Sequence, residues 1–108
     1  MENKGPFINE LPQTGEVTLL AVVLDKDLRP KRNGGSFLAL RFADRSGELD
    51  GKVWDNPEAV SQSFERDDVV KVRGTVEVYN DKPQIIVNRI RRCEPKEYNA
   101  ADFYASSA

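Results

Sequence analysis

Two runs of alternating residues, joined by one short turn, constrain the fold of this chain more than any other feature. They lie within residues 36–55, and every second side chain in them is apolar or glycine. Between the runs, Asp44-Arg45-Ser46-Gly47 has Asp first and Gly last, which is typical of a type I turn. Because successive strand residues point to opposite faces, the segment predicts a hairpin with one core-facing side. The core-facing positions are Leu38, Leu40, Phe42, Leu49, Gly51 and Val53.

The opposite face of this hairpin carries an unusual set of side chains. It consists of Phe37, Ala39 and Arg41 from the first strand and Asp50, Lys52 and Trp54 from the second. A large aromatic residue stands at each outer end, with two cations between them. We interpret this face as a surface on which a flat, charged polymer can lie.

Composition limits the class of protein. With 108 residues the chain supports one domain, and 31% charged and 39% hydrophobic residues are typical of a soluble globular protein. No apolar run approaches the roughly 20 residues needed to cross a bilayer, so we expect no membrane partner. The single cysteine, Cys93, fits a reducing, cytoplasmic environment. The net charge of −2 means that nucleic-acid binding requires local segregation of charge.

The absence of histidine argues against several chemistries. With no histidine and one cysteine, a conventional zinc site and the Ser-His-Asp and Cys-His arrangements are all excluded. The acidic residues are scattered without EF-hand spacing, and Gly34-Gly35 belongs to a turn and not to a phosphate-binding loop. We therefore expect no catalytic residues, no metal and no cofactor.

The remaining elements are β-rich. A strand beginning at Gly15 is apolar on both faces, which predicts a long, bent strand that is buried at more than one point. Arg29–Gly35 interrupts it, and Asn56-Pro57 marks a short helix with Asn as the N-cap, on which Val60 and Phe64 form one apolar ridge. The expected strands after this helix are Val69–Tyr79, with a bend at Gly74, and Gln84–Ile90, with a turn at Asn80–Pro83 between them.

Five strands with a helix between the third and fourth are the plan of the OB-fold, an all-β Greek-key barrel. A five-stranded open sheet is the alternative, but barrel closure hides edges that these valine-rich strands would otherwise expose. The predicted organisation is a loosely packed leader over 1–14, the OB-fold domain over 15–93 and a linker or tail over 94–108. In that tail, Tyr98, Phe103 and Tyr104 are expected to pack onto the barrel or onto a further domain.

One motif carries a resemblance to a known family. The pattern L-x-L-x-x-A-D-R-[ST]-G-x-[IL]-x-x-x-x-W-D begins at Leu38 and ends at Asp55. With residues 15–56 and 67–92, it resembles the N-terminal OB domain of bacterial YhaM-type 3′–5′ exoribonucleases. The chain is more weakly similar to the anticodon-binding OB domains of class II aminoacyl-tRNA synthetases. The resemblance covers about residues 6–105, and residues 101–104 resemble the segment that leads into the HD catalytic domain of the YhaM family.

The HD domain itself is missing, and its metal-binding histidines have no counterpart here. The resemblance therefore implies single-stranded nucleic-acid binding, with RNA the expected ligand, and not hydrolysis. It implies an HD catalytic domain as a partner in a longer protein. The alternative is an assembly module that docks a catalytic domain or a sister subunit. RNA and DNA are not distinguished by these residues, because that choice depends on contacts to one hydroxyl group.

OB-folds bind ligands on the face of strands two and three and in the loops that border it, which predicts a role for each candidate residue. Phe37 and Trp54 are expected to stack on bases, Arg41 and Lys52 to hold phosphates, and Asp50 to accept from a base amino group. The loop between the first two strands is expected to form a flexible cationic flap, and a second loop to border the face opposite it. The flap residues are Lys26, Arg29, Lys31 and Arg32, and those of the opposite loop are Tyr79 and Lys82.

Each of these assignments has a structural alternative. Phe37 and Trp54 would instead close the open end of the barrel against the helix, and the basic loop would be only a solvated turn. Arg89, Arg91 and Arg92 look clustered, but alternation separates them along the strand, so we interpret them as solvating. Cys93 is expected to be a small buried filler.

Overall fold

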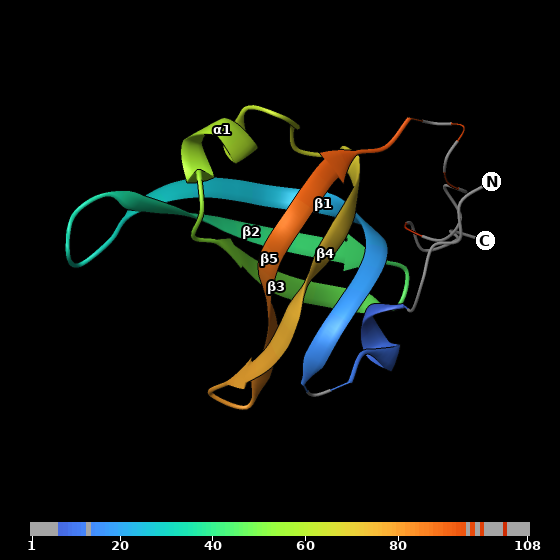
Figure 1. Cartoon of the computed structure of the whole chain (residues 1–108). Helices are drawn as coiled ribbons and strands as arrows, with labels where there is room; N and C mark the ends of the chain where they lie inside the picture. The colour runs from blue at the N-terminus through green and yellow to red at the C-terminus, as the bar shows by residue number, and fades with distance from the viewer. Residues whose placement is uncertain (1–6, 13, 95, 97, 99–102, 104–108) are drawn as a thin grey trace.

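The computed structural model describes residues 7–12, 14–94, 96, 98 and 103, except for the side chain of Tyr79. Five strands form a closed barrel, with neighbours in the order β1-β2-β3-β5-β4 (Figure 1). All neighbouring pairs are antiparallel except β3 and β5, whose short parallel ladder completes the barrel. The elements are η1 (Ile8–Glu10), β1 (Gly15–Pro30), β2 (Ser36–Asp44), β3 (Gly47–Val53), α1 (Pro57–Ser61), β4 (Val69–Tyr79) and β5 (Lys82–Arg92). The expected OB-fold plan is confirmed.

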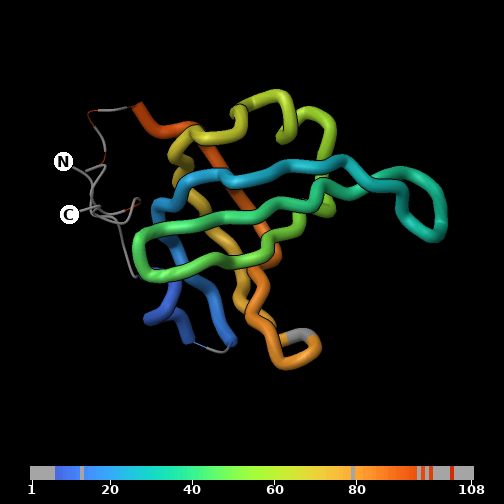
Figure 2. The backbone as a smooth tube through the Cα atoms, turned by 180° about the vertical axis from the view of Figure 1, so that it is seen from behind, coloured from blue at the N-terminus to red at the C-terminus, as the bar shows by residue number. Residues whose placement is uncertain are grey.

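Strand β1 is long because it belongs to two parts of the barrel. Its first half pairs with β4 and its second half with β2, and the register shifts between Val23 and Asp25. Beyond that bulge, β1 and β2 continue as a two-stranded arm that projects from the barrel and ends in the loop 31–35 (Figure 2). The expectation of a long, bent strand is confirmed, but the strand reaches Pro30 and the loop is shorter than predicted.

The core divides into two clusters, and β1 contributes to both. Alternate residues of β1 point into the barrel, where they pack with the inward faces of β2, β3 and β5. The other face of β1 helps to cover a second cluster, which includes Cys93 and Phe103, so both residues are buried as expected. Tyr98 contacts Phe103 edge to face, with ring centroids 5.4 Å apart. Tyr104 lies outside the described residues.

Of the predicted leader, Ile8 is packed more firmly than expected. Ile8 is buried in the barrel core, and its backbone N–H donates to Asp44 Oδ2 at 2.8 Å. The same carboxylate accepts from the backbone N–H of Ser46, which holds the β2–β3 turn in the expected Asp-first arrangement. The buried carboxylate of Asp44 therefore links the turn to the residues before β1.

Helix α1 differs from its prediction in two respects. Asn56 is the residue before the helix, but it has a left-handed backbone (φ 48°) and its side chain makes no capping hydrogen bond. The helix ends at Ser61, so Phe64 is buried in the core from the following loop and not from a helical ridge. Neither helical segment in the described chain has the length and hydropathy of a membrane-spanning helix.

The β4–β5 hairpin sets the register of the second half of the barrel. Asn80 and Asp81 both have positive φ, as a two-residue type I′ turn requires. Strand β5 consequently starts at Lys82 and runs to Arg92, longer at both ends than expected. A bulge between Arg73 and Gly74 shifts the pairing by one residue, at the glycine where a bend was predicted.

Candidate nucleic-acid interface

Phe37 and Trp54 lie side by side at one end of the β2–β3 face. The last pair of the β2–β3 ladder is Leu38 with Val53, so the two aromatic residues directly follow it on the outward side. Their ring centroids are 4.7 Å apart, with an angle of 31° between the planes. Trp54 is 44% exposed and Phe37 is half-buried. These two rings, here named the aromatic platform, form a continuous apolar surface instead of closing the barrel.

The loop 31–35 brings two exposed cations to this end of the face. The Lys31 Nζ lies 6.0 Å from the centroid of the Trp54 ring, and Arg32 follows it in the loop. Lys31 and Trp54 also line a shallow pocket of about 360 Å³ that reaches the start of α1 at Pro57. Arg29 is nearby, opposite Phe37 in the β1–β2 ladder, but its guanidinium pairs with Asp27 at 2.9 Å.

Lys26 does not belong to a cationic flap, contrary to the prediction. It lies within β1, and its side chain is only 17% exposed. Its Nζ donates to the backbone carbonyls of Ser61 and Phe64, each at 2.6 Å, and pairs with Glu65 at 3.5 Å. Lys26 therefore fastens the end of α1 and the loop after it to the β1–β2 arm.

The middle of the β2–β3 face is occupied by ion pairs. Arg41 Nη1 donates to Glu48 Oε1 at 2.6 Å, and Nη2 lies 3.2 Å from Asp50 Oδ1. The hydrogen bond to Glu48 and the charge of Asp50 raise the pKa of the Arg41 guanidinium above its usual value. Lys52 Nζ donates to Gln84 Oε1 at 2.8 Å. The predicted phosphate ligands on this face are thus already engaged with the protein itself.

The two predicted loops do not come together around the platform. Tyr79 and Lys82 face each other across the β4–β5 turn, and Lys82 is exposed. Both backbone views show this turn at one end of the barrel, apart from the loop 31–35 that ends the arm (Figures 1 and 2). The structure therefore brings Phe37, Trp54 and Lys31 together, with Arg32 next to Lys31 in the loop, and sets the turn that joins Tyr79 to Lys82 apart from them.

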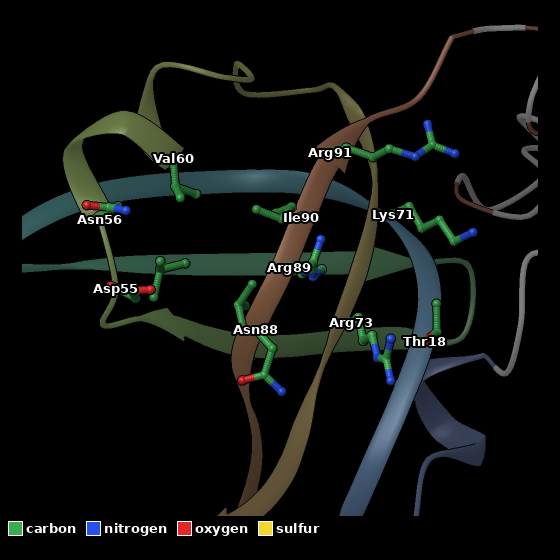
Figure 3. Close-up of a pocket in the computed structure, with 12 residues that line it drawn as sticks. Thr18, Asp55, Asn56, Val60, Lys71, Arg73, Asn88, Arg89, Ile90 and Arg91 are labelled. Carbon is green, nitrogen blue, oxygen red and sulfur yellow. The ribbon is translucent and has the colours of Figure 1, made fainter.

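Sequence reasoning missed a cluster of four cations on the outer face of β4 and β5. They line a pocket of about 620 Å³, here named the cationic groove, which also reaches Asp55 and Asn56 beside the platform (Figure 3). The four cations are Lys71, Arg73, Arg89 and Arg91. In the β4–β5 ladder Arg73 is opposite Arg89, and Lys71 is opposite Arg91.

The prediction that alternation separates these arginines was wrong for Arg89 and Arg91, which share one face of β5. The missed signal lay in the register. A two-residue turn at Asn80-Asp81 fixes which residues face each other, and the Gly74 bulge then moves Arg89 opposite Arg73. Counting outward from the turn without the bulge would place Arg73 opposite Asn88, so both the turn and the bulge are needed to predict the opposed cations.

Comparison with known proteins agrees with this architecture. The chain is 30% identical to the 3′–5′ exoribonuclease YhaM of Bacillus subtilis over 101 residues, which are 93% of this chain and 32% of that protein. It is 29% identical to the YhaM of Listeria welshimeri over 93 residues, 84% of this chain and 30% of that protein. The chain thus spans about a third of the length of these relatives, and the expected similarity is confirmed.

Solved structures share the fold at low sequence identity. A single-stranded DNA binding protein from Thermus aquaticus superposes with a TM-score of 0.64 and 22% identity, covering 73% of this chain and 40% of that one. The second OB-fold domain of replication protein A from Methanococcus maripaludis superposes with a TM-score of 0.62 and 24% sequence identity, covering 81% of this chain and 92% of that one. Residues 17–92 match the tRNA anti-codon family, described as an OB-fold nucleic acid binding domain. The chain therefore belongs to this family of OB-fold nucleic acid binding domains.

Proposed function

We propose that this domain binds single-stranded nucleic acid, with RNA as the natural ligand, through the aromatic platform and the cations of the loop 31–35. The observation that carries the proposal is the contact between the rings of Phe37 and Trp54. Their centroids lie 4.7 Å apart, and Trp54 is 44% exposed to solvent. Stacking on an aromatic ring tolerates any base, because every base has a π-face. Lys31, near the Trp54 ring, is placed to meet the phosphate of a base that stacks there.

We propose further that the domain acts as the substrate-binding part of a longer 3′–5′ exoribonuclease. The relatives that bear this name are about three times as long as the match, which leaves room in them for a separate catalytic unit. The sequence has no histidine and one cysteine, so it lacks the residues of a conventional zinc site and the histidines of an HD domain. In this proposal the domain holds the strand, and an HD domain performs the hydrolysis.

The test is a fluorescence-anisotropy titration of labelled oligo(U) with the wild-type chain and with Trp54→Ala. Removing one stacking partner should weaken binding roughly 10-fold, within the 1–3 kcal/mol that stacking contributes per base. Leu28→Ala is the matched control. Leu28 is 43% exposed on the same β1–β2 arm, but it alternates with Arg29, the residue opposite Phe37, and so lies on the other face.

Equal affinities for wild type and Trp54→Ala would reject the platform. If the wild-type chain bound neither oligo(U) nor oligo(dT) at low salt, the nucleic-acid proposal itself would fail and the assembly-module alternative would replace it. Oligo(dT) in parallel measures the preference between RNA and DNA.

A further inference from the structure

The cationic groove holds a local excess of positive charge on an acidic chain. Its lining includes four cations, Lys71, Arg73, Arg89 and Arg91, and one carboxylate, Asp55. Glu16 offsets part of this charge, because it pairs with Arg73 Nη2 at 2.8 Å. The lining therefore has more basic than acidic side chains, although the whole chain carries a net charge of −2.

The register of β4 and β5 sets the cations of the groove opposite one another. Arg73 stands directly opposite Arg89, and Lys71 directly opposite Arg91, in the antiparallel ladder. Like charges in directly opposed positions destabilise a sheet. Arg89 is exposed and forms no ion pair with any residue of the described chain. An anionic ligand on this face would reduce the repulsion between Arg73 and Arg89 and would give Arg89 a partner.

The groove adjoins the pocket beside the aromatic platform. Asn56 lines both the groove and the smaller pocket that Trp54 and Lys31 line. Figure 3 shows Asp55 and Asn56 at one end of the groove, with Lys71 and Arg73 toward the other end across β5 and β4. Asn88 and Thr18, which also line it, add neutral hydrogen-bonding groups. A polymer that stacks on Trp54 can therefore continue over β5 and β4.

The geometry points to the cationic groove as a second contact surface, which holds the phosphates of the same single strand after it leaves the platform. This inference rests on the proposed function. It places phosphate contacts on β4 and β5, where Arg89 has no ion pair within the described chain, whereas on the β2–β3 face Arg41 is held by Glu48 and Asp50 and Lys52 by Gln84. Repeated phosphates match a row of cations along two strands, and the adjoining aromatic platform favours a nucleic acid over an acidic protein segment.

The test compares Arg89→Gln with wild type on a short and a long oligo(U), about 4 and about 12 nucleotides, across the range of OB-fold site sizes. The long oligonucleotide should bind Arg89→Gln several-fold more weakly, and the slope of log K against log[salt] should fall by about 0.7 for each lost phosphate contact. The short oligonucleotide, which the platform alone accommodates, should bind both proteins equally. Arg66→Gln is the matched control. This substitution removes the same charge from an exposed arginine that does not line the groove.

A stability measurement separates this role from a structural one. Arg89→Gln relieves the opposition to Arg73, so its urea midpoint should equal or exceed that of wild type. Unchanged binding of the long oligonucleotide would overturn the inference and, if Trp54→Ala still weakened binding, would leave the platform intact. Equal losses in Arg89→Gln and Arg66→Gln would also overturn it, because they would show only the effect of net charge.

Discussion

The face of β2 and β3 and the groove over β4 and β5 adjoin on one barrel, yet they hold their charges in opposite ways. On β2 and β3, Arg41 lies between Glu48 and Asp50, and the aromatic platform stands at the end of the face. Over β4 and β5, cation faces cation across the ladder, and the described residues that line the groove include no aromatic side chain. The first surface therefore offers aromatic rings beside a cation that two acids neutralise, and the groove offers a set of opposed cations in which Arg89 has no ion pair within the described chain.

In our proposal, the bases therefore stack on the aromatic platform, and the phosphates contact the cationic groove. Stacking depends little on ionic strength, whereas phosphate contacts release counterions and weaken as salt rises. Affinity at high salt should therefore report the platform, and the salt dependence should report the groove together with Lys31 and Arg32. A barrel with a net charge of −2 can bind a polyanion if its cations are segregated in this way.

The largest effect that we expect comes from Gly74→Ala, which disturbs the groove without removing a charge. A Cβ at this position would overlap the backbone carbonyl oxygen of Ile86 and lie 2.9 Å from Ile85 Cγ1. Backbone of the neighbouring strand cannot rotate away as a side chain can, so the bulge that sets the arginine register must shift. We expect a loss of about 3 kcal/mol in the free energy of unfolding, measured by urea denaturation.

Two other glycines serve as controls for this prediction. Gly51, under the β2–β3 face, would place its Cβ against the ring of Phe42, a side chain that can adjust in part, so Gly51→Ala should cost about 1–2 kcal/mol. Gly47 has its nearest neighbour at 4.0 Å, and Gly47→Ala should change stability by less than about 0.5 kcal/mol. A Gly74→Ala protein as stable as Gly47→Ala would show that the β4–β5 register does not depend on the glycine.

Lys26, in β1, and Lys31, in the loop that ends the β1–β2 arm, should have different roles. Substituting Lys26 should affect stability, and substituting Lys31 should affect binding of nucleic acid. Lys26→Gln removes a charged donor from the Ser61 and Phe64 carbonyls and should lower the free energy of unfolding by about 2 kcal/mol. Lys31→Gln should leave stability unchanged and reduce the salt slope of oligo(U) binding by about 0.7. Urea denaturation and anisotropy on both variants measure these effects. If Lys26→Gln instead reduced the salt slope and left stability unchanged, Lys26 would belong to the cationic flap as first predicted.

The barrel was predictable from the sequence because its strands alternate cleanly and its turns have characteristic residues. Val69–Tyr79 was predicted with both boundaries correct, and the β2–β3 hairpin with all its core-facing residues. The start of α1 was harder to describe, because Asn56 takes a left-handed backbone where a capping side chain was expected. The sequence preference therefore located the residue before the helix correctly but not its backbone conformation.

The candidate site was predictable only where it depends on one hairpin. The adjacency of Phe37 and Trp54 follows from alternation and a tight turn, both of which are local. The pairing state of Arg41 and the burial of Lys26 depend on residues brought near by the fold, which a pattern along the sequence does not contain. The cationic groove depends on a bulge that shifts the β4–β5 register by one residue. It was therefore not predicted, although the sequence contains all four cations.

The smallest effect that we expect is that of Asp50→Asn. It distinguishes two roles for Asp50, as the partner of Arg41 or as an acceptor for a base. Sequence reasoning made it an acceptor for a base amino group, whereas in the structure it pairs with Arg41 at 3.2 Å. If the pair is its main role, Asp50→Asn removes a charge that repels phosphate, and both oligo(U) and oligo(C) should bind about 2-fold more tightly at low salt. If it reads a base, Asp50→Asn should weaken oligo(C) alone, because uracil has no exocyclic amino group to donate. Glu48→Gln, which removes the other partner of Arg41 farther along β3 from Trp54, should have a smaller effect on both ligands.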